Sequence, residues 1–149
     1  MHIAERIMAA VQAALTGLPT TGARVFRAYD LELETADLPA LLLSMGGTAP
    51  LHVAVSSTLT GRLEVEVTAV VAIAGVAGEN VETALNRINA EVVRALKADY
   101  TLGGLVILVE EAGADAPALD VGSAADRPLA VQVSRFAVQY RRAWHDPEL

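Results

Sequence analysis

The stretch that most constrains the fold is residues 80–111, where a helix, a glycine turn and an apolar segment follow one another. Apolar side chains recur there at spacings of three and four residues and form one helical stripe: Val81, Leu85, Ile88, Val92 and Leu96. Asn80 is the expected N-cap, because its side-chain oxygen can accept a hydrogen bond from the first turn. Leu102-Gly103-Gly104 ends the helix, since glycine readily adopts a positive φ. Residues 105–111 are then predicted as a strand.

Composition predicts one domain spanning residues 1–149. Hydrophobic residues make up 53% of the chain and aromatic residues only 4%, so the core is expected to be aliphatic. The large apolar fraction in a small chain favours an oligomer over a monomer.

Charge and leader signals exclude several classes of protein. A net charge of −7 disfavours tight binding to nucleic acid, and the absence of cysteine excludes disulfides and thiolate catalysis. The N-terminus lacks the basic region of a signal peptide, and the longest uncharged apolar run, residues 67–77, is shorter than the roughly 20 residues of a bilayer span. A soluble cytosolic protein with no membrane contact is expected.

The first half of the chain predicts one helix and several strands. Residues 2–16 carry a helical stripe that ends at Gly17 and Pro19. Three strands are expected from apolar or alternating side chains: residues 25–28, 38–45 and 62–73. Between them lie a charged connector at 30–37, a break at 46–50, and a partly extended segment at 51–60. In the strand at residues 62–73, the loss of alternation after Thr68 indicates that the second half is covered on both faces of the sheet.

The C-terminal third predicts an arm, a strand and a tail. Residues 112–126 are small and polar, which is typical of a long flexible hairpin loop or arm. Residues 127–142 form a strand whose apolar positions change from odd to even numbers, so a β-bulge is predicted near Ser134-Arg135. Residues 143–149 are expected to be a loose tail. The order of elements favours an α+β domain with an antiparallel or mixed sheet and two helices on one face.

Few residues fit the pattern of a catalytic or metal-binding site. His2, His52 and His145 are widely separated and lack the spacing of metal ligands. Glu64 and Glu66 share one strand face, where a solvated surface is a simpler interpretation than a pair for acid–base catalysis. Gly75-x-x-Gly78 lacks the further residues of a phosphate-binding loop, and no motif for a nucleophile is present. No enzymatic activity, metal or cofactor is expected.

Candidate interface regions are residues 46–60, residues 112–126, and a basic and aromatic group near the C-terminus. The loop acids Asp115, Asp120 and Asp126 lack calcium-loop spacing and are expected to aid solubility. A basic and aromatic group near the C-terminus fits either a partner contact or an edge strand protected by charge. The full set of candidate interface residues is Gly46, Gly47, Arg62, Asp115, Asp120, Arg135, Tyr140, Arg141, Arg142 and Trp144.

Several segments, taken in order, resemble the bacteriophage tail terminator family, also called minor tail protein U-like or tail completion proteins. The segments are the opening helix from Glu5, Asp37-Leu38-Pro39-Ala40-Leu41, the Gly46-Gly47 turn, Ala95 to Gly104, and Val138-x-Tyr140-Arg141. The resemblance implies an α+β subunit of a ring, typically a hexamer, with a structural role. Such a ring caps the tail tube, ends its polymerisation and presents a joining surface to the head.

The implied partners are other copies of the chain, the tail tube protein and the head–tail connector protein, with DNA only as cargo passing through the channel. The implied location is the head-proximal end of the tail in the virion, after assembly in the host cytoplasm. Two alternatives stay open: a related tail-tube or connector protein, and a small cytosolic ligand-binding domain or enzyme.

Overall fold

The structure is a computed structural model that describes residues 1–149 except 28–36, 54–56, 74, 77 and 121–128. Within the described residues the chain forms an α+β fold with a mixed, open sheet, as predicted. In chain order the elements are α1 (Ile3–Leu15), β1 (Val25–Arg27), β2 (Ala40–Val53), β3 (Thr58–Ala72), α2 (Val81–Ala98), β4 (Leu108–Ala114), β5 (Ala118–Asp120) and β6 (Leu129–Ala143).

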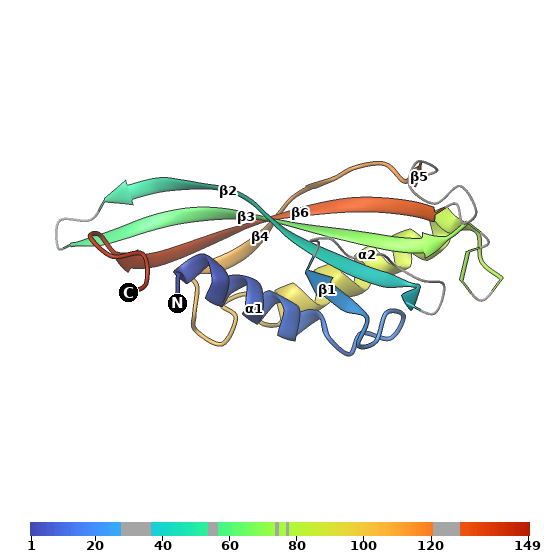
Figure 1. The fold of residues 1–149 in the computed structure, drawn as a ribbon, viewed down its shortest axis with the longest axis horizontal. Coiled ribbons are helices and arrows are strands. Elements are labelled where there is room, and N and C mark those ends of the chain that lie inside the picture. Colours follow the sequence, from blue (N-terminus) through green and yellow to red (C-terminus); the bar gives the residue numbers. More distant parts are fainter. Residues whose placement is uncertain (28–36, 54–56, 74, 77, 121–128) are drawn as a thin grey trace.

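Both predicted helices are confirmed, and each begins at a side-chain cap. Asn80 accepts a hydrogen bond from the backbone N–H of Thr83 at 2.8 Å. His2, considered above as a possible ligand, instead caps α1, since its Nδ1 accepts from the backbone N–H of Ala4 at 3.0 Å. The two helices lie side by side under one face of the sheet (Figure 1).

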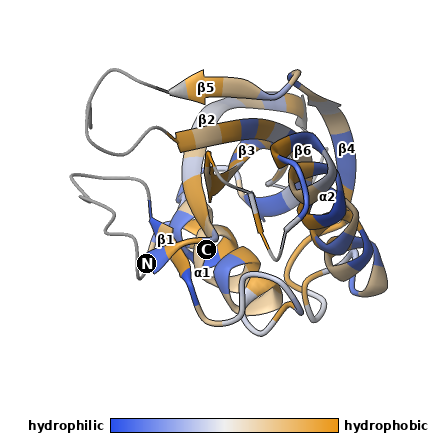
Figure 2. Ribbon diagram, turned by 90° about the vertical axis from the view of Figure 1, so that its right-hand side faces the viewer, coloured by the Kyte–Doolittle hydropathy of each residue, from blue (hydrophilic) through white to orange (hydrophobic). Residues whose placement is uncertain are grey.

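The strands run in the order β1-β2-β3-β6-β4, with β5 also paired to β6. β1 is parallel to β2, and every other described pairing is antiparallel. β3 and β6 stay in register from Thr58↔Ala143 to Ala72↔Leu129 without a shift. The long strands twist strongly and, seen end-on, the sheet curves over the helices (Figure 2).

The core fills the space between the helices and one face of the sheet, which we call the inner face. Alternate strand residues point into this core together with the stripes of both helices. On β3 these residues are Leu63, Val65, Val67, Ala69 and Val71. Val70 is also buried, although it points to the opposite, outer face, so the predicted covering of both faces at this end of the strand is confirmed.

The predicted break at residues 46–50 is wrong, because β2 continues through it. Two register shifts against β3, between Met45 and Thr48 and between Pro50 and His52, each accommodate one extra residue. A Cβ on Gly46 would lie 3.0 Å from the Cβ of Glu64, so glycine is favoured there by a close approach between strands.

The predicted bulge near Ser134-Arg135 is also wrong, since β6 passes this point in perfect register with β3. Even-numbered residues of β6 face the helices along its whole length. The apolar residues Val131 and Val133 therefore point to the outer face, and the polar Gln132 and Ser134 point inward.

The region after α2 differs from the prediction in two respects. β4 begins at Leu108, not Leu105, because Leu102, Gly103 and Gly104 all take positive φ and prolong the turn. Residues 112–120 are not an arm: they continue along the edge of β6 as the end of β4, a short break and β5. The remainder of the predicted arm, and most of the predicted connector at 30–37, lie outside the described residues.

The C-terminal tail, which we expected to be loose, turns back onto the start of α1. The backbone N–H of Ile3 donates to the carbonyl of Pro147 at 2.9 Å, and Ala143 forms a bridge with Asp146.

Candidate functional site

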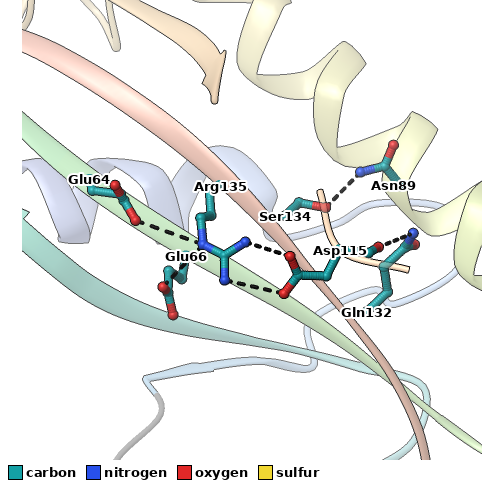
Figure 3. A network of polar contacts seen from close by, with 7 residues as sticks. All are labelled: Glu64, Glu66, Asn89, Asp115, Gln132, Ser134 and Arg135. Carbon is teal, nitrogen blue, oxygen red and sulfur yellow. Dashed lines mark hydrogen bonds and ion pairs between the residues drawn. The ribbon is translucent and has the colours of Figure 1, made fainter. Parts of the chain in front are cut away.

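The outer face carries a charged group centred on Arg135, which we call the Arg135 cluster: Arg62, Glu64, Glu66, Asp115 and Arg135. Figure 3 shows these residues except Arg62. Arg135 binds Asp115 through two hydrogen bonds, Nη1–Oδ1 at 2.8 Å and Nη2–Oδ2 at 3.2 Å. Its Nε lies 3.4 Å from Glu66 and 3.8 Å from Glu64. Arg62 approaches Glu64 at 4.0 Å.

Three strands position this cluster. Glu66 is directly opposite Arg135 in the β3–β6 register, so the two side chains leave the sheet on the same face. Asp115 follows β4 and is held by its own backbone N–H, which donates to the carbonyl of Val133 at 2.8 Å. The hydrogen bond from Arg135 lowers the pKa of Asp115, and the same hydrogen bond raises the pKa of Arg135.

A second polar group lies on the inner face directly behind the cluster. Asn89 of α2 donates to the hydroxyl of Ser134 at 2.7 Å, and Gln132 donates to the carbonyl of Asp115 at 3.1 Å (Figure 3). These contacts give the hydroxyl of Ser134 and the side-chain N–H of Gln132 partners inside the fold, whereas Oε1 of Gln132 is buried without a hydrogen-bond partner. Sequence analysis missed them, because the alternation of β6 was interpreted as a change of face.

A third polar group ties the loop after α1 to α2. The carboxylate of Glu91, which is buried, accepts hydrogen bonds from the backbone N–H of Thr20 at 2.9 Å and from its hydroxyl at 2.6 Å. Arg87 donates to the same hydroxyl at 3.2 Å. These contacts fix the loop after α1 against α2, and each oxygen of the buried carboxylate accepts a hydrogen bond.

The structure brings together three of the candidate interface residues. Arg62, Asp115 and Arg135 all belong to the Arg135 cluster, although they come from three different strand regions. Glu64 and Glu66, considered above as a catalytic pair, lie in the same cluster and face the guanidinium group of Arg135.

The basic and aromatic residues near the C-terminus do not form one group. Arg135 and Arg141 share the outer face but are six residues apart, which is about 20 Å along a strand. Tyr140 is 4% exposed and packs over Gly61, so its side chain belongs to the core. Arg142 donates to the carbonyl of Ala143 at 2.8 Å.

Four further candidates lie apart from the cluster. Gly46 and Gly47 occupy the first bulge of β2, and Trp144 is 58% exposed beyond the end of β6. Asp120 ends β5, and its side chain is outside the described part of the structure.

Two other kinds of site are absent from the described residues. They contain no group of three His, Asp or Glu side chains arranged to hold a metal ion. None of their helices has both the length and the apolarity needed to cross a membrane.

Comparisons with known proteins give little to build on. No protein-family model matches the chain, and no curated protein matches it. Among solved structures, a chain from "Virion of native gene transfer agent (GTA) particle" aligns over 93% of this chain and 92% of its own length. The two share 17% sequence identity with a TM-score of 0.38, a weak likeness to a virion component that carries no argument about function.

Proposed function

We propose that this protein is a structural component of a phage-like tail, a terminator that forms a ring on the end of the tail tube. The observation that carries the proposal is the shape of the sheet. β2, β3 and β6 are 14 or 15 residues long, whereas strands average about 5–6 residues. Both described helices cover one face only, so the outer face and the strand edges are available for contacts between copies.

The proposed role is non-catalytic. Glu64 and Glu66 both face Arg135, which keeps them as partners in ion pairs and leaves no free acid–base pair at this position. The resemblance of the opening helix, the Gly46-Gly47 segment and the last strand to tail terminators supplies the particular role in capping.

The test is a tube-growth assay with the tail tube protein of the same particle. Tube subunits are polymerised with and without this protein, and tube lengths and ends are recorded by negative-stain electron microscopy. Tubes are expected to stop growing and to carry a ring at one end. Unchanged tube length over a tenfold molar range would contradict the terminator role.

Three other outcomes distinguish the alternatives. A tube protein would form long polymers by itself, whereas a connector would bind capped tails or heads without changing tube length. A small-molecule role would appear as a ligand-dependent rise in melting temperature.

A further inference from the structure

The edge of β2 is unpaired over much of its length in the described structure. β1 pairs only with Leu41–Leu43 of β2, and the described residues contain no strand beside residues 45–51, which we call the free edge. This segment contains no ionisable side chain, and its Met45 and Leu51 are 36% and 49% exposed. Charges that would oppose pairing with another chain are absent from this edge, although Pro50 and the two bulges reduce the number of backbone groups that can pair there.

The opposite edge of the sheet is formed by β4. On its far side from β6, β4 has no neighbouring strand among the described residues. Its residues Glu110 and Glu111 are exposed, and Glu111 is paired with Lys97 of α2 at 2.8 Å. The sheet therefore ends in two different edges, one uncharged and one acidic. The acidic residues oppose pairing of two β4 edges with each other, whereas the free edge of β2 carries no like charge against them.

The strand directions determine how two copies can join. β2 is antiparallel to β3, β3 to β6, and β6 to β4, so β2 and β4 run in opposite directions. Rotation about an axis along the strands leaves every strand direction unchanged. In such an arrangement β2 of one copy meets β4 of the next copy in antiparallel orientation, and the alternation continues around the ring.

From these observations we infer that copies of this chain join by backbone pairing between the free edge of β2 and the β4 edge of a neighbouring copy. The inference rests on the proposed ring and names the contact that closes it. The contact is heterologous, so it can close by rotation, and it covers Met45 and Leu51.

Thiol cross-linking tests the pairing directly, because the chain has no cysteine and introduced thiols are therefore the only ones present. One cysteine is placed on each edge by Thr48→Cys and Glu111→Cys, singly and together. Both positions belong to the inner face, because their register partners Leu63 and Phe136 point into the core. A short flexible bis-maleimide tolerates a register offset of a residue or two. The double variant is expected to give a ladder from dimer to the full ring, and each single variant nothing above background. Efficient dimers from Thr48→Cys alone would indicate edge-to-edge pairing of two β2 strands and overturn the inference.

A charge on the free edge gives an independent test. Ala49→Lys is expected to weaken association at least tenfold by sedimentation, with an unchanged far-UV spectrum. Ala9→Lys, an exposed position on α1, is the matched control and should associate normally. Equal association of the two variants, or a monomer at every concentration, would overturn the pairing.

The outcomes separate this inference from the proposed function. A ring that is cross-linked in the double variant but does not cap tubes supports the pairing and contradicts the terminator role. A ring that caps tubes without cross-linking supports the role and overturns the pairing.

Discussion

The two halves of β6 have opposite patterns of polarity, although the strand has no register shift against β3. In residues 135–143 the apolar side chains Phe136, Val138 and Tyr140 face the helices, and polar side chains face outward. In residues 129–134 the polar Gln132 and Ser134 face the helices, and Val131 and Val133 face outward. The strand keeps its orientation throughout, so the inner face changes from apolar to polar where α2 offers Asn89 as a partner.

This difference shows that alternation reports the polarity of each face and does not identify which face meets the helices. Hydrogen bonds offset the cost of burying the hydroxyl of Ser134 and the side-chain N–H of Gln132, although Oε1 of Gln132 has no such partner. The first half of β6 therefore depends on specific polar contacts, and the second half on packing.

Phe136→Ala should have the largest effect, because it removes a large buried side chain from the half that depends on packing. The expected loss is about 3–5 kcal/mol of unfolding free energy, measured by urea denaturation. Val133→Ala, on the outer face of the same strand, should cost about 1 kcal/mol or less. Equal losses would show that the outer face of the first half is packed as tightly as the core.

Gly61→Ala tests how closely β3 packs against Tyr140 in the second half of β6. A Cβ at Gly61 would lie 2.7 Å from the ring of Tyr140, so the ring must move. We expect a loss of about 1–3 kcal/mol by thermal or urea unfolding. The control is Gly47→Ala, where the new Cβ meets no atom within 4 Å and stability should change little.

Asn89→Ala tests the half that depends on polar contacts. It leaves the buried Ser134 hydroxyl without its 2.7 Å partner and should cost about 1–2 kcal/mol. Replacing both partners, by Asn89→Ala with Ser134→Ala, should cost less than the sum of these two single changes in a double-mutant cycle. Additive losses would show that this hydrogen bond contributes nothing beyond its separate side chains.

The smallest effect is expected for the exposed Asp115–Arg135 pair at the outer face. Its hydrogen bond to Arg135 lowers the pKa of Asp115 in the folded chain. A lowered folded pKa stabilises the fold above the unfolded value of about 3.9, and this contribution is lost as the pH falls through the folded value. Arg135→Gln should raise the pKa of Asp115 towards its ordinary value, as measured by NMR titration of the carboxyl group. An unchanged titration curve would contradict the hydrogen bonding between Arg135 and Asp115.

Local signals in the sequence predicted which segments form helices and strands better than they predicted how the strands pair with one another. The α2 stripe and the Asn80 cap lie within one segment, so spacing alone identified them. The continuation of β2 through Gly46-Gly47 depends on pairing with β3, and the same dipeptide is typical of a turn. Register is a tertiary property, which a single segment does not encode.

The sequence predicted which residues belong to the candidate site, but it did not predict how their side chains contact one another. Arg62, Asp115 and Arg135 were all identified, but nothing in the sequence indicates that Asp115 binds Arg135, 20 positions away along the chain. Tyr140 was grouped with surface residues because aromatic and basic side chains adjoin there. Strand alternation directs its ring inward, between the outward-facing Gln139 and Arg141.

The unbroken register between β3 and β6 also has a mechanical consequence. Backbone hydrogen bonds between antiparallel strands lie perpendicular to the strand axis, so a pull along that axis loads the whole ladder at once. The ladder between β2 and β3 is interrupted at two bulges and divides the load into shorter groups. We therefore expect the β3–β6 pair to resist tension along the strands longer than the β2–β3 pair.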